Sequence, residues 1–565
     1  MSAVIYYHPE AYSTEGPKLM GRNAAGESFL KGFLRHSTAS EFCAQVQKTE
    51  HGEQFFQAVR KNGRQEPVSI LEKHNLGGLE RFGNVYYPGP GIGIYARQRS
   101  IAAQGQIANP HAAWSLCGIS HTTSSHGAMD SLAELITSPV QPWDALICTS
   151  TAVKDNIQRV LQAQVNSLRD RLGITKLVLP LMPVIPLGIH TEEFIFSDAQ
   201  KSKARKEIGT DDNTLVVLYM GRLSFHAKAH PLAMYSALER TAQAVAPMGK
   251  KVVLVECGWH ANDFIQKAYK EAAQRICPSV RVITLDGREA SSRVQAWSSA
   301  DVFCSLSDNI QESFGITPIE AMAAGLPVVV SDWDGYKDTV RHLEDGFRIP
   351  TCMPGPGLGI VLASRHALDI DSYDMYCGHA CSFVSVDIDA AAQAFIKLIE
   401  SPALRQEMSQ NARLRAQNTF DWSRVIKQYE SLWDEQRRIR IESQKNNSPF
   451  PSLIQRLETC PSRMDPFYAF AQYPTQTLQD STLLVHVEKD LEKSIEKFHL
   501  LKSLAMVNFA KAVLPSDEEI YKVLKLTANG TLTAKWVAEN FEAHRKGHIF
   551  RSLVWLLKIG ILKTV

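Results

Sequence analysis

The chain has 565 residues, of which 44% are hydrophobic and 21% charged, and its formal net charge is +2. One hydrophobic core rarely serves a chain of this length, so we expect roughly two to four domains. The near-neutral charge gives no reason to expect a nucleic acid or another polyanion as the main partner.

The ten cysteines and the start of the chain bear on its location. Several cysteines lie within apolar runs, which indicates buried free thiols in a reducing compartment rather than a disulfide framework. The first residues lack the pattern of a signal peptide. No window has the roughly 18 consecutive apolar residues of a membrane-spanning helix, and the nearest one, 549–562, is interrupted by Arg551 and Lys558. We therefore expect a cytoplasmic protein with at most peripheral membrane contact.

The first part of the chain alternates between strand and helix patterns. An apolar strand at 4–7 is followed by a glycine-bearing loop at 21–26 and a helical pattern at 27–35, and further strands are expected at 114–120 and 145–149. This alternation is typical of a parallel α/β sheet. Because ligands bind at the carboxyl ends of such strands, His121 is a candidate site residue.

A second α/β unit follows a proline-rich extended stretch at 183–189, which indicates a domain boundary. Its buried strands are expected at 215–220, 252–257, 280–285, 302–305 and 328–331, and a helix over 422–440 closes it.

Residues 351–382 interrupt this pattern with a turn-rich insertion. It contains Cys377, His379 and Cys381, three residue types that bind zinc. Structural zinc sites usually have a second pair of ligands at finger-like spacing, which is missing here. We therefore expect a packed loop near the mouth of the active site rather than a metal site.

After about residue 445 the chain changes character. A linker-like stretch at 446–451 precedes four helical patterns, at 491–510, 517–526, 534–541 and 547–562. Such an arrangement resembles a helix-turn-helix or winged-helix unit. Basic and acidic residues are interleaved without a basic stripe, so protein contact or homo-oligomerisation is favoured over DNA binding.

The most informative segment is 312–320, with the sequence ESFGITPIE, followed by AMAAGLP and three valines. A helix start offers backbone N–H groups and a positive dipole end, which suit a phosphate. The carboxylates of Glu312 and Glu320 suit the hydroxyl groups of a sugar. In an alternative interpretation Thr317, Pro318 and Glu320 only form a capping box.

Two cations precede this segment in the same unit. Arg222 follows Gly221 directly after the strand at 215–220, and Lys228 lies six residues further on. Arg222 can bind phosphate oxygens in a bidentate manner and Lys228 adds a second positive charge, which together match a nucleoside diphosphate. The segment as a whole therefore indicates a nucleotide-sugar site.

With Gly221-Arg222, Lys228 and the stretch from Glu312 to Val329, the sequence resembles the retaining GT-B glycosyltransferases of family 4. The resemblance is clear over 214–435 and weaker over the first 190 residues. It implies an α/β protein with two Rossmann-like domains that face each other across a cleft. We expect an acceptor domain at 1–188, a donor domain at 189–444 and a mainly helical, winged-helix-like accessory domain at 445–565.

The resemblance also implies the roles of individual residues. Arg222 and Lys228 would bind the diphosphate, and Glu320 the ribose. Glu312 and His121 would act catalytically on the transferred sugar, which Glu312 also binds. Backbone groups complete the donor site, from Gly26 in the first domain and from Phe314, Gly315 and Ile316. One departure is Asp334, where the family often has a glutamate.

We therefore expect a retaining hexosyltransferase that uses a UDP- or GDP-sugar, without a cofactor. No Asp-x-Asp pair is available for a divalent metal, so protein cations would stabilise the leaving phosphate. The acceptor stays open between a glycan, a lipid, a protein and a small molecule. Two alternatives also stay open: a GT-B epimerase or phosphorylase, and a non-catalytic scaffold with a partner-binding tail.

Overall fold

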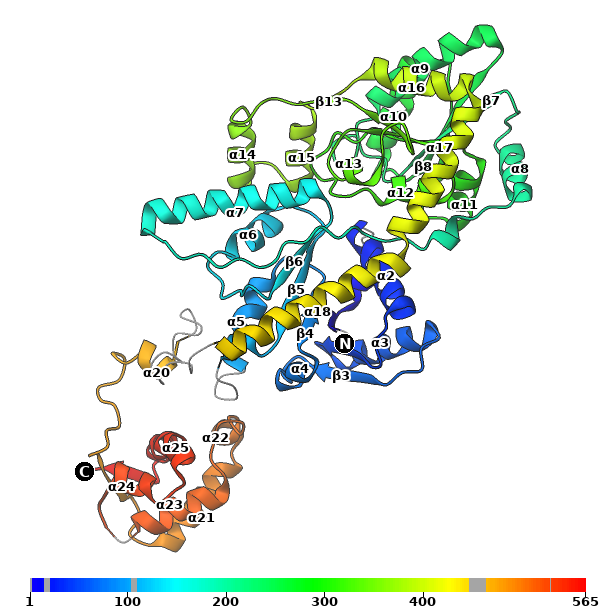
Figure 1. Cartoon of the computed structure of the whole chain (residues 1–565). Helices are drawn as coiled ribbons and strands as arrows, with labels where there is room; N and C mark the ends of the chain where they lie inside the picture. The colour runs from blue at the N-terminus through cyan, green and yellow to red at the C-terminus, as the bar shows by residue number, and fades with distance from the viewer. Residues whose placement is uncertain (1–2, 15–20, 103–108, 447–463, 529) are drawn as a thin grey trace. The chain divides into compact units, whose positions relative to one another are not determined.

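A computed structural model describes residues 3–14, 21–102, 109–446, 464–528 and 530–565. The chain separates into two compact units, Met1–Thr459 and Cys460–Val565. The larger unit contains two six-stranded parallel sheets, each covered by helices (Figure 1). Among the described residues, no helix is long and apolar enough to cross a lipid bilayer.

The first sheet has the strand order β3-β2-β1-β4-β5-β6 and is parallel throughout. Its strands are β1 (Val4–Tyr7), β2 (Phe42–Val46), β3 (Val68–Glu72), β4 (Asn84–Tyr86), β5 (Ser115–Ser120) and β6 (Ala145–Cys148). Five of them are buried at every position or nearly so, as expected for strands covered on both faces. The expected strands at 4–7, 114–120 and 145–149 are thus present.

The helices of this domain are α1 (Pro9–Tyr12), α2 (Gly21–His36), α3 (Thr49–Lys61), α4 (Gly77–Phe82), α5 (Ile92–Ala102), α6 (His126–Glu134) and α7 (Thr151–Leu172). The prediction of a loop at 21–26 is wrong, because these residues form the first turns of α2. Gly26 lies against α1, where a Cβ atom would come within 1.9 Å of the Ala11 carbonyl oxygen. Its lack of a side chain serves helix packing.

The second sheet has the order β12-β11-β10-β7-β8-β9, also parallel. Its strands are β7 (Thr214–Met220), β8 (Lys251–Gly258), β9 (Arg281–Asp286), β10 (Val302–Ser305), β11 (Val328–Ser331) and β12 (Gly346–Ile349). Its helices are α8 (Asp198–Glu207), α9 (Leu232–Val245), α10 (Asp263–Ile276), α11 (Ala290–Ser299), α12 (Ile316–Ala323), α13 (Tyr336–Thr339), α16 (Ile388–Glu400) and α17 (Pro402–Arg415). Two Rossmann-like sheets in one unit confirm the GT-B prediction.

The long helix α18 (Trp422–Asn446) returns from the second domain to the first. Trp422 is fully buried and donates its indole N–H to Ser28 Oγ at 2.8 Å. Glycines make room for its ring, because a Cβ atom at Gly32 or Gly188 would approach the indole within 2.5 Å or less. Helix α18 packs against α2, which ties the two domains together (Figure 1).

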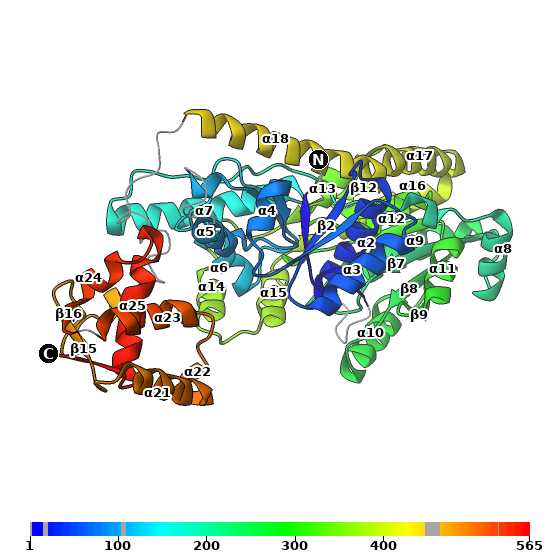
Figure 2. The same ribbon diagram turned by 90° about the horizontal axis from the view of Figure 1, so that it is seen from below.

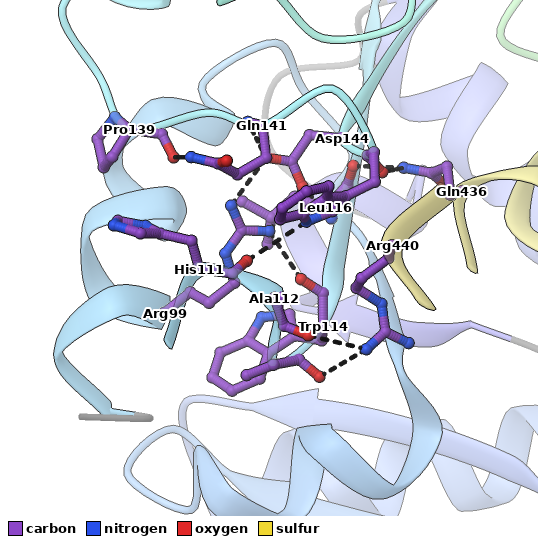
Figure 3. Close-up of polar contacts among 12 residues, drawn as sticks. Arg99, His111, Ala112, Trp114, Leu116, Pro139, Gln141, Asp144, Gln436 and Arg440 are labelled. Carbon is purple, nitrogen blue, oxygen red and sulfur yellow. Dashed lines mark hydrogen bonds and ion pairs between the residues drawn. The ribbon is translucent and has the colours of Figure 1, made fainter. Parts of the chain in front are cut away.

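Hydrogen bonds hold the far end of α18 against the first domain, next to a buried ion pair (Figure 3). Arg99 and Asp144 are both fully buried and form two hydrogen bonds of 2.6 and 2.8 Å. Gln436 of α18 donates to the Leu116 carbonyl at 2.8 Å, and Arg440 donates to the Ala112 carbonyl at 3.0 Å. The pair and the helix thereby satisfy polar backbone groups that burial would otherwise leave unpaired.

The insertion at 351–382 forms a helical hairpin. Its base is an antiparallel pair, β13 (Thr351–Cys352) with β14 (Ser385–Val386), and its two helices are α14 (Ile360–Ala367) and α15 (Tyr373–Cys381). His379 lies 3.0 Å from Asp371 through Nδ1, and Cys381 Sγ donates to the Phe225 carbonyl. Within the described ranges, no three His, Cys, Asp or Glu side chains could hold a metal ion together.

The smaller unit contains a three-stranded antiparallel sheet of order β16-β15-β17, in addition to the helices predicted there. The strands are β15 (Leu483–His486), β16 (Leu532–Thr533) and β17 (Leu562–Thr564), and the helices are α20 (Pro466–Ala469), α21 (Leu491–Ser503), α22 (Ala505–Asn508), α23 (Asp517–Thr527), α24 (Ala534–Glu539) and α25 (Lys546–Lys558). The helix predicted over 491–510 is divided, because Leu504 is extended. The winged-helix assignment stays a prediction.

Candidate functional site

The loop after β7 places the two candidate cations. Arg222 is held by its own loop, because its guanidinium donates to the Ala227 carbonyl at 2.7 Å. Lys228 Nζ lies 2.6 Å from Glu312 Oε2, so these two residues, both expected to bind the sugar donor, form an ion pair. A cation that exchanges a carboxylate partner for a phosphate stays compensated in both states, which suits a site that binds and releases a diphosphate.

Glu312 is the centre of this arrangement. Its side chain is 9% exposed, and besides Lys228 it accepts hydrogen bonds from the Ser313 N–H at 3.3 Å and the Tyr336 hydroxyl at 3.4 Å. Burial disfavours the ionised form, but the Lys228 ammonium and the backbone N–H groups of Ser313 and Phe314 together outweigh burial and lower the pKa of Glu312 below its ordinary value. Glu312 is therefore an ionised acceptor that can bind sugar hydroxyls.

Helix α12 begins directly beyond this carboxylate. Gly315 is its N-cap residue, with φ of +86°, and Phe314 is buried beneath it. A Cβ atom at Gly315 would lie 2.1 Å from the Tyr336 ring, so both the backbone angle and the space require glycine. No side chain within the described residues caps this helix, so the alternative interpretation of Thr317, Pro318 and Glu320 as a capping box is wrong. Its first N–H groups are available to an anion.

Glu320 lies within α12, one turn after Ile316. Burial raises the pKa of Glu320 to about 7, and the nearby charge of Arg293 opposes this only in part. At neutral pH this carboxyl group is therefore present in both forms and can both donate and accept hydrogen bonds. Such a group fits the vicinal hydroxyls of a ribose, which also donate and accept.

His121 directly follows β5 and contacts this site from the first domain through its backbone. Its carbonyl oxygen accepts a hydrogen bond of 2.8 Å from Ser313 Oγ, the residue next to Glu312. Burial, with a smaller contribution from the positive charge of Arg22 in the first turn of α2, lowers the pKa of His121 to about 4. The imidazole is thus neutral at physiological pH and can contact a sugar hydroxyl without adding positive charge.

The structure adds residues that the sequence did not single out. Ser150, the N-cap of α7, donates to the Ser313 carbonyl at 2.8 Å and to Asp334 Oδ1 at 3.4 Å. The Thr151 N–H donates to Asp338 at 2.5 Å. The start of α7 therefore docks onto the second domain beside Glu312. Only the small polar residues after the strand at 145–149 hinted at this contact.

Asp334, the departure from the family pattern, belongs to the same cluster. It has φ of +43°, an uncommon value for a residue other than glycine. Burial raises the pKa of Asp334 to about 8, and the neighbouring charge of Glu312 contributes. A protonated Asp334 beside an ionised Glu312 gives the site one hydrogen-bond donor and one acceptor of the same chemical type.

Five of the expected residues lie close together. Arg222, Lys228, Glu312, Gly315 and His121 converge where the two domains touch. Gly26 packs against α1, as described above, and its expected role toward a phosphate stays a prediction. Ser313, next to Glu312 in the second domain, links the two domains at this place through its hydrogen bonds with Ser150 and His121 of the first domain.

Comparison with known proteins agrees with this geometry. Residues 200–354, which contain the Arg222 loop and helix α12, match the family described as glycosyl transferases group 1. An uncharacterised glycosyltransferase of Methanocaldococcus jannaschii is 30% identical over 167 residues, 29% of this chain and 39% of the relative.

A D-inositol 3-phosphate glycosyltransferase of Pseudarthrobacter chlorophenolicus is 26% identical over 243 residues, 43% of this chain and 47% of the relative. The chain thus spans less than half the length of these curated relatives. A solved structure of Anabaena HepE in complex with UDP and glucose is also similar, with 16% identity, 77% of this chain and 100% of that chain covered, and a TM-score of 0.46.

Proposed function

We propose that the protein is a retaining glycosyltransferase that moves a hexose from a UDP- or GDP-sugar to the hydroxyl of an acceptor, without a metal ion. The observation that supports it most directly is the Lys228–Glu312 pair at the start of α12, with Arg222 in the same loop. This arrangement joins cations for a diphosphate to a carboxylate for a sugar.

The chemistry follows from the charges. As the bond from the anomeric carbon to the diphosphate oxygen breaks, the leaving group gains negative charge, which Arg222, Lys228 and the N–H groups of α12 stabilise. The acceptor oxygen forms the new bond to the same face of the anomeric carbon, and its proton passes to the leaving phosphate oxygen. Glu312 and neutral His121 orient the sugar ring through its hydroxyls.

The first test is a thermal-shift screen of nucleotide sugars on the full chain, because a bound donor stabilises the folded state by mass action. The selected donor is then assayed for sugar transfer. Arg222→Ala, Lys228→Ala and Glu312→Ala should each lower turnover about a hundredfold, the usual effect of losing a transition-state contact. Near-wild-type rates in all three would refute the assigned roles.

The matched control is Arg275→Ala. Arg275 is an exposed cation of the same domain, paired with Glu271 on α10. It should change turnover far less than Arg222→Ala. Comparable losses in both variants would indicate a general electrostatic effect of the domain rather than a specific diphosphate site.

Two alternatives give different results. An epimerase would convert the donor without any acceptor, and a phosphorylase would transfer the sugar to and from inorganic phosphate. A scaffold would show no turnover at all with any nucleotide sugar. The unit Cys460–Val565 is tested separately: a deletion of this unit that stays oligomeric would exclude it as the dimerisation element.

A further inference from the structure

The α14–α15 hairpin belongs to the second domain by chain connection but contacts the first. At the base of the hairpin the chain leaves the second domain through β13 and returns to it through β14, and these two strands are paired. Figure 2 shows α14 and α15 beside α6, which follows the loop that carries His121. The hairpin therefore reaches the catalytic loop of the opposite domain.

A row of hydroxyl groups connects the hairpin to that loop. The hydroxyl of Tyr373 lies 3.3 Å from Ser124 Oγ, which is buried, and Ser124 Oγ lies 3.5 Å from Thr122 Oγ1. The Thr122 carbonyl in turn accepts from Ser120 Oγ at 3.2 Å. The row ends on the residues on either side of His121. Tyr373 is thus positioned to set where this loop lies.

The opposite face of α15 is fixed to the donor side. Gly378 lies against His226, whose Cβ would be 2.9 Å from a Cβ atom at position 378. His226 is part of the loop that carries Arg222 and Lys228, and Asn309 donates to its carbonyl at 3.0 Å. A helix held this tightly on the donor loop gives Tyr373 a fixed position relative to the donor cations.

Further contacts also join the hairpin to the first domain. The His366 ring stacks on Tyr376 at 4.0 Å and meets the edge of His126, at the start of α6, at 3.8 Å. His126 Nδ1 also lies 3.5 Å from Asp369. These contacts join the hairpin to α6, whereas the Tyr373 contact joins it to the loop of His121 itself.

We propose that Tyr373 is a positioning residue, which acts through Ser124 and Thr122 to hold His121 in register with the donor loop of the other domain. This inference rests on the proposed glycosyl transfer and on the role of His121 in it. The physical reason is that a shift of about 1 Å in a catalytic group can cost a factor of a hundred in rate. His121 lies on a loop. Ser313 contacts it from the donor side, through a hydrogen bond to the His121 carbonyl.

The test compares Tyr373→Phe with Tyr376→Phe, which removes a hydroxyl from the same helix while keeping the ring that stacks on His366. With the donor from the screen, Tyr373→Phe should lower kcat about five- to tenfold, the effect of one hydrogen bond, and leave the donor KM unchanged. Ser124→Ala should give the same loss, and Tyr376→Phe should match the wild type.

A double-mutant cycle separates positioning from a general structural effect. In a His121→Ala background, Tyr373→Phe should cause no further loss, because its effect passes through the missing imidazole. A full additional loss would overturn the proposal, as would a wild-type kcat in the Tyr373→Phe single variant.

A measurement without turnover keeps this inference distinct from the proposed function. Amide hydrogen exchange over residues 120–126 should be faster in Tyr373→Phe than in Tyr376→Phe. If no nucleotide sugar reacts, the proposed function fails, and the exchange rates alone decide whether Tyr373 holds the loop. Equal exchange in both variants would overturn the proposal.

Discussion

Replacing Lys228 with methionine tests the central pair most directly. Methionine keeps an unbranched apolar side chain but removes the charge 2.6 Å from Glu312. Glu312 then keeps its contacts with the Ser313 N–H and the Tyr336 hydroxyl, at 3.3 and 3.4 Å, and both distances are long. A buried carboxylate is thus left without its compensating charge.

The magnitude follows from burial. Removing one partner of a fully buried ion pair costs about 3–5 kcal/mol. Because the Lys228 side chain is 30% exposed, solvent already screens part of this interaction, so we expect a loss of about 2 kcal/mol at neutral pH. The pKa of Glu312 should rise above its ordinary value of 4.5, because only backbone N–H groups then oppose the effect of burial.

The sign of the pH dependence is fixed by this pKa. In the wild type, the stabilisation from Glu312 is present above pH 4.5 and is lost as the pH falls through the lowered pKa. In the variant, ionisation above pH 4.5 is instead unfavourable in the folded state. The difference in unfolding free energy should therefore be small near pH 4 and grow toward pH 7.

Urea unfolding at several pH values, followed by fluorescence, measures this difference. Lys251→Met is the control, because Lys251 and Asp211 form an exposed pair whose loss should have little effect. Lys228→Met/Glu312→Gln should be more stable at pH 7 than Lys228→Met, because the uncompensated charge is gone. A single variant as stable as the wild type at pH 7, or a loss independent of pH, would refute the reasoning.

Three further predictions concern other parts of the larger unit. Asp144→Asn should lower the unfolding free energy by about 3–5 kcal/mol, because Arg99 becomes an unpaired buried charge; Arg99→Met/Asp144→Leu should lose less in the same urea experiment. Burial and the charge of Glu312 raise the pKa of Asp334 from 3.8 to about 8. Between pH 3.8 and pH 8 the folded state therefore holds a proton on Asp334 that the unfolded state lacks, so the free energy of unfolding falls as the pH rises through this range. Asp334→Asn should therefore lose less stability than the wild type between pH 5 and pH 8, and equal slopes would contradict the raised pKa. Gly315→Ala should weaken donor binding and lower Tm, because φ of +86° and the Tyr336 ring exclude a side chain; Gly355→Ala, where nothing lies within 4 Å of the new Cβ, should change neither.

The sequence predicted the strand pattern of both sheets because buried parallel strands leave nearly continuous apolar runs, as at Val328–Ser331. Local rules were less reliable at helix starts. The run at 21–26 looked like a loop because it holds two glycines, yet it begins α2. Likewise Thr317 and Pro318 resembled a capped helix start, whereas α12 begins at Ile316 after Gly315. Packing against α1 and Tyr336 decided both cases.

Sequence alone also determined the types of group in the donor site, since Arg222, Lys228, Glu312 and Glu320 lie within one α/β unit at recognisable spacing. It could not determine which groups meet across domains. The contacts of Ser313 with His121 and Ser150 join residues more than 160 positions apart, as does the contact of Tyr373 with Ser124 over 249 positions. Protonation likewise depends on burial and neighbouring charges, so only the tertiary structure distinguishes ionised Glu312 from the neutral carboxyl of Asp334.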